Sequence, residues 1–485
     1  MLTIIENIKS LFTSRFESEP TEVEKIPQSG SDRIYFRVKG KQDCIATWNL
    51  NQKENQTFLH FSKHFKEVGC PVPAIYAVND ELTIYLQQDF GDKSLLNELE
   101  QQGPTEYVYN LFQKSLFHLA HLQIKGDEHL NYDWCITSKE FGKQAILADL
   151  LYFKYYFLDA LKMPYDKELL IDDFEALSNY LTHVDHKYFM YRDFQSRNIM
   201  VQNGVIHFID YQGGMKGALQ YDVASLLWQA KADLTDEWKQ SLLHYYMDCV
   251  ENILQKPIDR IRFVSQYNGY VLIRLLQVLG AYGFRGLFER KAHFLTSIPI
   301  ALKNLKWFLK NKQIGISMPE FERILSLMVD DEVIRRFEPI KATADTPLVV
   351  TINSFSYKTT GIPKDESDNG GGFVFDCRGI LNPGRIEEYK TQTGRDKGVK
   401  DFLEQQTRMP QFLNSVYNII DITVEDYIQR GFEHLQISFG CTGGQHRSVY
   451  AADAIARHLK NKFAVKTELK HLVQDGKNWI NTKEK

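Results

Sequence analysis

A chain of 485 residues is long enough for roughly two to four domains, and its hydrophobic share of 43% can fill several cores. The 58 lysines and arginines nearly balance the 62 acids, so the net charge of -4 gives no overall attraction to nucleic acid or a membrane surface. The cysteines lack the paired spacing of a disulfide framework or zinc site, which favours a reducing cytoplasm; they are Cys44, Cys70, Cys135, Cys249, Cys377 and Cys441.

The N-terminal residues 1–16 read as an amphipathic helix with charges at Glu6, Lys9 and Arg15. They lack the apolar block and the cleavage site of a signal peptide. No uninterrupted apolar run approaches the ~20 residues that a membrane-spanning helix requires. We therefore expect a protein that is neither exported nor inserted in a membrane.

A turn of small residues follows this helix, between two predicted strands. Small side chains let a backbone approach phosphate closely, and the residues concerned are Ser29, Gly30 and Ser31. With a single glycine in the turn, an ordinary hairpin explains the pattern about equally well.

A helix is predicted over residues 53–66, because Phe58, Phe61 and Phe65 recur at helical spacing and mark a core face. Glu54 near its start either holds a phosphate-pairing base or complements the positive end of the helix.

Helical periodicity then dominates from about residue 104 to residue 336. The expected helices cover residues 106–122, 141–161, 172–183, 237–254, 260–287 and 294–311. Arg274, Arg285 and Arg290 lie late in this stretch, and the pattern does not show where their side chains point.

The most informative stretch runs from Tyr191 to Asn198, with Asp210 twelve residues later at the end of an apolar strand. Asp193 can accept a proton from a hydroxyl group, and the amide oxygen of Asn198 can share a magnesium ion with Asp210. Taken alone, the pattern is weak, because an Asp followed by an Asn is common and a strand-ending Asp is often a turn residue or a helix cap.

The neighbouring pattern strengthens this interpretation. Residues 186–192 and 205–209 read as two short strands, which would place Asn198 and Asp210 at facing ends of a hairpin. A capped helix start follows at Tyr221 and Asp222. We expect Asp222 to brace the loop through hydrogen bonds rather than to touch a substrate.

This order of pieces resembles the aminoglycoside phosphotransferase and choline kinase family, a small-molecule branch of the protein-kinase-like fold. The likeness spans about residues 15–310 and is carried by Asp193, Asn198, Asp210, Gln212, Gly213, Gly214, Tyr221 and Asp222. Within that family, residues 30–38 and 191–200 look most like the anomeric kinases of N-acetylmuramate and N-acetylglucosamine.

The resemblance implies a bilobal α+β domain over residues 1–338, with a small lobe at about 1–88, a helical lobe at about 89–338, and ATP and Mg²⁺ in the cleft. It implies that Asp193 is catalytic and that Asn198 and Asp210 hold the metal. Residues 84–91 look like the strand and hinge between kinase lobes. The implied nucleotide contacts are Ser29, Gly30, Ser31, Arg37, Gln88 and Asp89.

Two positions depart from the family pattern. Tyr191 stands where the family usually has histidine. The strand at residues 44–48 lacks the lysine that pairs with nucleotide phosphates in many kinases. Arg37, Lys41 and Lys53 are the candidates for that charge, and a non-catalytic kinase-like scaffold stays open as an alternative.

The helical pattern stops near residue 338, so we expect a linker over 339–347 and a separate α/β domain over 348–485. The expected strands of this domain are 348–357, 372–378 and 434–439. The expected helices are 397–405, 410–430 and 446–461.

A strand, a glycine-rich turn and a helix start meet at residues 435–448. Backbone N–H groups and the helix dipole converge there, which favours an anion, although the glycines could simply tighten a corner. The predicted phosphate cup consists of Cys441, Thr442, Gly443, Gly444, Gln445, His446, Arg447 and Ser448. The same Cys441-to-Arg447 spacing is that of cysteine-dependent phosphatases, but Gly440 replaces their preceding histidine.

The whole domain resembles the C-terminal domain of RapZ, a bacterial adaptor that senses glucosamine 6-phosphate. The matching segments are residues 354–358, 373–378, 382–383, 393–396 and 440–450. The resemblance implies sugar-phosphate binding without chemistry, with further contacts from Lys358, Arg378 and Arg395, and it hints at a homo-oligomer. The tail from Arg457 has eight basic residues against three acids, so RNA binding is a minor hypothesis and a solvated helix face is favoured.

Together the two parts predict a cytoplasmic ATP- and Mg²⁺-dependent kinase of an amino sugar such as N-acetylmuramate or N-acetylglucosamine, acting on the anomeric hydroxyl in one version of the hypothesis. A sugar-phosphate effector would act through the C-terminal domain. The alternatives are a scaffold controlled by glucosamine 6-phosphate and a phosphatase at Cys441.

Overall fold

The computed structural model describes residues 2–26, 33–185, 187–289, 292–338, 340–367 and 371–481. The chain divides into two compact units, one of Met1–Phe284 with Ile300–Ile334 and one of Arg285–Pro299 with Arg335–Lys485. The division at a linker over residues 339–347 stays a prediction from the sequence.

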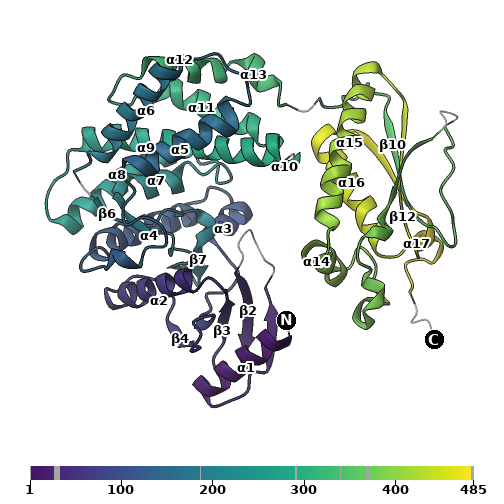
Figure 1. The fold of residues 1–485 in the computed structure, drawn as a ribbon, viewed down its shortest axis with the longest axis horizontal. Coiled ribbons are helices and arrows are strands. Elements are labelled where there is room, and N and C mark those ends of the chain that lie inside the picture. Colours follow the sequence, from purple (N-terminus) through teal and green to yellow (C-terminus); the bar gives the residue numbers. More distant parts are fainter. Residues whose placement is uncertain are drawn as a thin grey trace. The chain divides into compact units, whose positions relative to one another are not determined.

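The first unit begins with helix α1 (Leu2–Phe16), which packs on a five-stranded antiparallel sheet of order β1-β2-β3-β5-β4 (Figure 1). Ile8 and Phe12 of α1 are buried against Phe36 and Val38 of β2, because apolar faces of helix and sheet leave water together. The strands are β1 (Glu22–Lys25), β2 (Ile34–Lys39), β3 (Cys44–Trp48), β4 (Ile75–Val78) and β5 (Ile84–Gln88).

Helix α2 (Gln52–Glu67) lies between β3 and β4 in the chain. The side chain of Asn51 caps its start by accepting the backbone N–H of Glu54. Its three phenylalanines, Phe58, Phe61 and Phe65, are buried, as the helical spacing predicted.

Helices dominate the rest of this unit, as predicted. They are α3 (Leu95–Gln102), α4 (Glu106–Lys125), α5 (Lys143–Phe153), α6 (Lys167–Thr182), α7 (Leu219–Leu227), α8 (Asp236–Leu254), α9 (Arg260–Tyr282), α11 (Ile298–Asn311), α12 (Pro319–Met328) and α13 (Asp331–Arg335). Two of the expected helices are subdivided, because α5 and α9 each continue into a π-helical turn, at Lys154–Leu158 and Gly283–Phe288.

Helix α9 with its π-helical turn, Arg260–Phe288, is long and apolar enough to cross a membrane by length and composition. We did not expect a membrane-spanning segment here from the sequence, because Arg274 interrupts the apolar run of this helix. Half of the apolar window is buried inside the protein.

Two short antiparallel ladders lie between α6 and α7. Strand β6 (Lys187–Met190) pairs with β9 (Met215–Ala218), and β7 (Ile199–Gln202) pairs with β8 (Val205–Phe208). The expectation that the two strands around residues 186–192 and 205–209 form one hairpin was wrong, because each pairs with a strand that the sequence did not reveal.

The second unit contains a four-stranded parallel sheet of order β11-β12-β10-β13. Its strands are β10 (Val349–Ser356), β11 (Gly372–Asp376), β12 (His434–Cys441) and β13 (Lys466–His471). Its helices are α10 (Ala292–Leu295), α14 (Lys397–Gln405), α15 (Met409–Arg430), α16 (Arg447–Phe463) and α17 (Leu472–Gly476). Three strands and three helices confirm the predicted elements to within a few residues.

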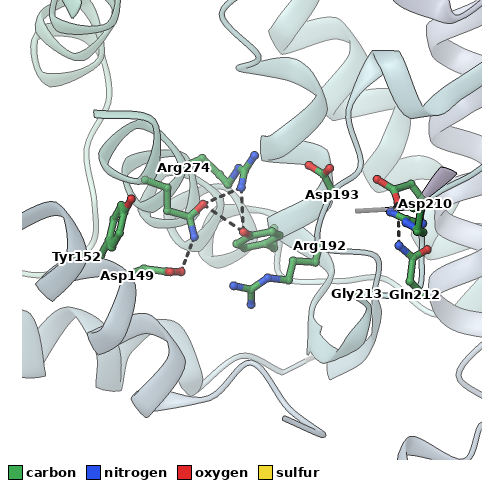
Figure 2. A pocket seen from close by; sticks show the side chains of 11 residues that line it. Asp149, Tyr152, Arg192, Asp193, Asp210, Gln212, Gly213 and Arg274 are labelled. Carbon is green, nitrogen blue, oxygen red and sulfur yellow. Dashed lines mark hydrogen bonds and ion pairs between the residues drawn. The ribbon is translucent and has the colours of Figure 1, made fainter. Parts of the chain in front are cut away.

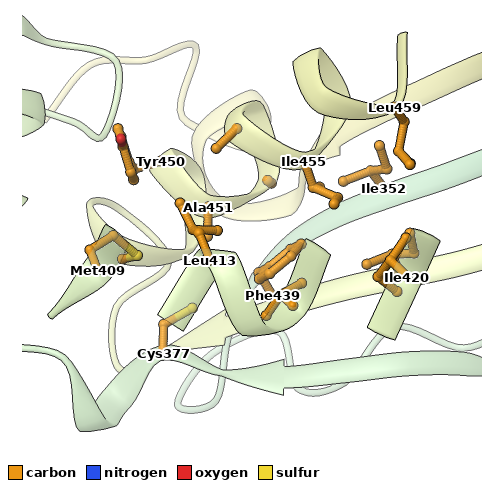
Figure 3. Packing of buried hydrophobic residues seen from close by; sticks show 14 of the residues in the cluster. Ile352, Cys377, Met409, Leu413, Ile420, Phe439, Tyr450, Ala451, Ile455 and Leu459 are labelled. Carbon is orange, nitrogen blue, oxygen red and sulfur yellow. The ribbon is translucent and has the colours of Figure 1, made fainter. Parts of the chain in front are cut away.

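The core of this unit lies between the sheet and helices α15 and α16. Figure 3 shows Ile352 of β10 and Phe439 of β12 in one cluster with Leu413 and Ile420 of α15 and Ile455 of α16. All five side chains are buried, and such packing of a helix layer on parallel strands is the usual way to close an α/β core.

Candidate active site

A cavity of about 510 Å³ in the first unit contains the predicted catalytic aspartate. It is called the Asp193 pocket below, and Figure 2 shows its lining side chains. These are Arg33, Asp149, Tyr152, Arg192, Asp193, Asp210, Gln212, Gly213, Tyr221, Arg274 and Gln277. The structure thus brings Asp193 and Asp210 to one pocket from opposite ends of the β7–β8 segment.

The loop between β6 and β7 holds Asp193 through several donors. Gln195 Nε2 donates to Asp193 Oδ1 at 2.6 Å, and Asn198 Nδ2 donates to Oδ2 at 3.1 Å. Arg197 forms an exposed ion pair with the same carboxylate at 3.2 Å. A carboxylate fixed by charge-assisted hydrogen bonds presents its oxygens in one orientation, which a group that positions a hydroxyl needs.

Asp222 near the start of α7 braces this loop, as predicted. Its Oδ2 accepts the backbone N–H of Tyr191 at 2.7 Å and its Oδ1 accepts that of Arg192 at 2.9 Å. Gln123 of α4 donates to the same carboxylate at 2.9 Å. Burial of Asp222 raises its pKa to about 7, against these donors, which lower it. The helix α7 begins at Leu219, two residues before the predicted cap, and has no side-chain cap.

Tyr191 replaces the expected histidine by a direct tether. Its hydroxyl donates to the backbone carbonyl of Ile209, and the side chain is fully buried. The loop that carries Asp193 is therefore fastened to the residue that precedes Asp210.

Asn198 and Asp210 lie at facing ends of the β7–β8 hairpin, and the backbone N–H of Ile209 donates to Asn198 O at 3.1 Å. This placement was predicted correctly, although the pairing of the strands was not. Asp210 has a φ of +72°, a left-handed conformation that costs energy for a residue with a side chain.

The donor set at these two residues fits a divalent cation. The Asn198 amide nitrogen donates to Asp193, and its amide oxygen has no hydrogen bond among the described residues. Next to Asp210, the side-chain oxygen of Gln212 is buried without a partner there, while the Gln212 nitrogen donates to Asp210 Oδ1 at 2.8 Å. Magnesium prefers such hard oxygen ligands.

Arg33 is a site residue that the sequence analysis missed. Its Nη2 lies 2.5 Å from Asp210 Oδ1 and its Nε lies 3.4 Å from Glu54 Oε1 of α2. Burial would raise the pKa of Asp210, but Arg33 and the hydrogen bond from Gln212 act against it, and the net effect lowers that pKa. Glu54 therefore holds a base, which was one of its two predicted roles, and the base comes from the start of β2 instead of the strand at residues 44–48.

The three basic residues considered for that charge are engaged elsewhere. Arg37 Nε pairs with Asp89 at 2.7 Å, Lys41 donates to the carbonyl of Phe16, and Lys53 donates to the carbonyl of Ile136. No local sequence feature distinguished Arg33 from them.

The other predicted nucleotide residues do not line the Asp193 pocket. Asp89 is occupied by Arg37 and by the backbone N–H of Gly91, and Gln88 ends β5. Ser29, Gly30 and Ser31 lie outside the described residues. Contact of these residues with a nucleotide stays a prediction.

The glycine-rich turn of the second unit joins β12 to α16, as predicted. Cys441 is buried, with its Sγ 3.1 Å from Ser448 Oγ and accepting the backbone N–H of Gly444 at 3.2 Å. Arg447 does not face outward from the turn, because its Nη1 donates to the carbonyls of Arg378 at 3.1 Å and Ile380 at 2.7 Å. This arginine ties the helix start to the segment after β11.

The side chains of Gln445 and His446 are also turned toward the protein. Gln445 Nε2 donates to the carbonyls of Lys390 and Gln392, and His446 Nε2 lies 2.8 Å from Tyr389 O. Burial lowers the pKa of His446. The Nε of Arg447 is buried without a hydrogen-bond partner among the described residues, so it is left as a donor for an anion beside the backbone N–H groups of the turn.

The three further basic residues predicted for sugar-phosphate binding are partly engaged. Lys358 is exposed, and Arg378 is exposed and paired with Asp376. Arg395 pairs with Asp453 of α16 at 2.8 Å. Their contact with a sugar phosphate stays a prediction.

Comparison with known families gives two matches. Residues 22–253 match the phosphotransferase enzyme family, and residues 348–474 match the RapZ C-terminal domain.

Two curated relatives are both named nucleotide-binding protein. The one from Endomicrobium trichonymphae is 35% identical over 156 residues, which are 32% of this chain and 49% of the relative. The one from Fusobacterium nucleatum is 33% identical over 195 residues, which are 38% of this chain and 61% of the relative. The chain spans about half the length of the curated relatives it matches.

Several solved structures are similar to a part of the chain. A choline kinase from Cryptosporidium parvum is 13% identical with a TM-score of 0.45, covering 67% of this chain and 99% of that one. A putative aminoglycoside phosphotransferase from Ralstonia eutropha is 13% identical with a TM-score of 0.44, covering 64% and 99%.

Proposed function

We propose that this chain is a cytoplasmic ATP- and Mg²⁺-dependent kinase of an amino sugar, because residues 22–253 match the phosphotransferase enzyme family and residues 348–474 match the RapZ C-terminal domain. N-acetylmuramate and N-acetylglucosamine are the proposed acceptors, and the anomeric hydroxyl is the proposed position. The observation that carries this proposal is the shared pocket of Asp193 and Asp210, with Asn198 bonded to Asp193.

In the proposed reaction, Asp193 orients the sugar hydroxyl and accepts its proton. The hydroxyl oxygen forms the new bond to the γ-phosphorus, the bond from that phosphorus to the bridging oxygen breaks, and ADP leaves with that electron pair. Mg²⁺ bound by Asn198 and Asp210 would neutralise the charge on the phosphate oxygens. Arg33, held between Glu54 and Asp210, takes the role of the missing strand lysine.

The second domain is proposed to bind an amino-sugar phosphate such as glucosamine 6-phosphate and to adjust the kinase. The backbone N–H groups at the start of α16 support this, because such a turn favours an anion. The phosphatase alternative is disfavoured, since Arg447, which would clamp phosphate oxygens, donates to backbone carbonyls instead.

The test is incubation of the full chain with ATP, Mg²⁺ and a panel of sugars, with phosphorylated products identified by mass spectrometry. Replacing the proton acceptor in Asp193→Asn is expected to slow turnover by ~10²- to 10⁴-fold, the usual contribution of a general base. Equal turnover by Asp193→Asn would refute the assigned role. Absence of any phosphorylated sugar would favour the alternative of a non-catalytic scaffold controlled by sugar phosphate.

A further inference from the structure

The Asp193 pocket contains two arginines and one aspartate, Asp149, that form no ion pair among the described residues. Three arginines and three aspartates line it. Arg33 is paired with Asp210, and Asp193 is held by Arg197 and by two amides. Two arginines, Arg192 and Arg274, remain to be accounted for.

Arg274 projects from the middle of α9 and makes only neutral hydrogen bonds. Its Nη1 donates to Gln277 Oε1 at 2.7 Å and to the Tyr221 hydroxyl at 3.1 Å. No carboxylate lies within ion-pair distance of it among the residues that the structure describes. Its charge is balanced only at longer range, by Asp193 and Asp149, so an anionic group in direct contact with the guanidinium would be favoured.

Arg192 likewise has no carboxylate partner within ion-pair distance in the described part of the chain. Its guanidinium carbon lies 5.3 Å from the centre of the Phe141 ring, and its side chain reaches into the pocket in Figure 2. Its backbone has a φ of +74°, where glycine would be unstrained. An arginine held in this conformation, beside the catalytic aspartate, offers its charge to the cavity at a conformational cost.

These two arginines lie toward the acceptor side of Asp193. In Figure 2, Asp193 is drawn between Arg274, Asp149 and Tyr152 in one direction and Asp210 and Gln212 in the other. The nucleotide phosphates belong with Asp210 and Arg33, because the metal ligands are there. The charge on Arg192 and Arg274 is therefore available to the phosphoryl acceptor.

We propose that Arg192 and Arg274 form an anion subsite, so that the acceptor is a sugar carrying a carboxylate or phosphate group as well as the hydroxyl that is phosphorylated. This rests on the proposed kinase function and narrows it to acidic acceptors. Asp149, which accepts a hydrogen bond from Gln277, supplies an acceptor for a sugar hydroxyl or amide at the same end of the pocket.

The first test compares matched sugars by calorimetric titration into the full chain, in the presence of Mg²⁺ and ADP. N-acetylmuramate differs from N-acetylglucosamine by a lactyl ether that bears a carboxylate, and glucuronate and glucose 6-phosphate are compared with glucose. We expect at least one acid to bind ~10- to 100-fold more tightly than its neutral partner, the range for a charge-assisted hydrogen bond. If no acid exceeds its neutral partner, the subsite proposal is wrong.

The second test removes the arginines. Arg192→Gly deletes the charge and also relieves the positive φ, so the fold should keep or gain thermal stability while the preference for the acid is lost. Arg274→Gln should also lose it, whereas Arg262→Gln, an exposed residue of α9 paired with Asp185, should keep it. Equal weakening of acid and neutral sugar in Arg192→Gly and Arg274→Gln would overturn the proposal.

The two proposals fail in different ways. Binding of the sugars is measured without turnover, so an acid preference that depends on Arg192 upholds the subsite even if no phosphorylated product forms. Phosphorylation of a neutral sugar as efficiently as its acidic counterpart would keep the kinase and reject the subsite.

Discussion

Arg33 shows how a single side chain can restore a charge that the usual position lacks. It bridges Glu54 on α2 and Asp210 after β8, so it links the sheet-containing part of the unit to the proposed metal site. In kinases that have a lysine on the corresponding strand, a lysine–glutamate ion pair occupies the equivalent position. A guanidinium has five donors, so it can keep both carboxylates and still donate to a phosphate oxygen.

Replacing this residue in Arg33→Gln should weaken catalysis more than it weakens sugar binding. We expect the KM for ATP to rise or kcat to fall by ~10- to 100-fold, the loss that follows removal of one charge-assisted contact. Steady-state kinetics with varied ATP measure this, and Lys39→Gln, from an exposed pair with Asp43, is the control. Unchanged kinetics in Arg33→Gln would contradict this role, and Arg37 would then be the candidate for the phosphate-pairing charge.

At the scale of elements, the turn between β12 and α16 depends on close backbone approach at Gly394. A Cβ there would lie 2.3 Å from His446 O and 2.5 Å from Tyr450 N, which are backbone atoms and cannot move aside cheaply. Gly394 also donates its N–H to Gln445 O at 3.0 Å. The segment around residue 394 and the glycine-rich turn thus fold as one piece.

The substitution Gly394→Ala should therefore destabilise the second unit by about 1–3 kcal/mol, the usual cost of overpacking. Gly443→Ala is the matched control, because nothing lies within 4 Å of a Cβ at that position. Hydrogen exchange of peptides from β12 and α16 measures both variants. Similar protection in the two variants would contradict the tight fit at residue 394.

The ion pair between Arg395 and Asp453 gives α16 a pH-dependent anchor. Burial raises the pKa of Asp453, but His471 and Arg395 outweigh it and lower the pKa to about 2. Since this folded pKa lies below the ordinary value of 3.8, the stabilisation is complete above that value and is lost as pH falls toward 2.

In Asp453→Asn we expect the second unit to lose about 2 kcal/mol of stability at neutral pH. The difference from the wild type should shrink between pH 4 and pH 2. Denaturation by urea, followed by hydrogen exchange of α16 at several pH values, tests this. The control Asp426→Asn removes an exposed pair with Arg430 and should change stability by about 0.5 kcal/mol or less at any pH.

The sequence predicted those helices and strands whose apolar residues recur at a regular spacing. Helix α14 and strand β10 were predicted nearly to the residue, because their core faces recur at regular spacing. Strand β13 was missed, since Lys466, Glu468 and Lys470 make it read as a charged tail. It is an edge strand paired only with β10, and charged side chains protect such edges from aggregation.

The candidate site was predicted as far as its local motif reached. Asp193, Asn198, Asp210 and the bracing Asp222 lie within one short stretch, so their relation was visible in the sequence. Arg33 and Arg274 come from segments far apart in the chain, and only the fold brings them to the pocket. The charge of Arg274, within the apolar second half of its helix, was the one signal that could have pointed to it.

At the scale of the whole molecule, the two units have separate cores and carry separate thiols. All six cysteines are buried and free. Cys44, Cys70, Cys135 and Cys249 belong to the first unit, and Cys377 and Cys441 belong to the second.

Pulsed alkylation in rising urea should therefore label the thiols in two groups. Within each group, the cysteines should become reactive together, because a compact core opens cooperatively. Mass spectrometry of the labelled peptides identifies the groups. A single transition for all six thiols would show that the units unfold as one.

The tether from Tyr191 to Ile209 has one more consequence. A histidine at position 191 would gain or lose a proton near neutral pH, and the strength of its hydrogen bond to Ile209 would change with its charge. Burial instead raises the pKa of the Tyr191 phenol well above its ordinary value of 10. The hydroxyl group therefore stays protonated, and keeps its hydrogen bond to Ile209, in an acid-stressed cell and in an alkaline one.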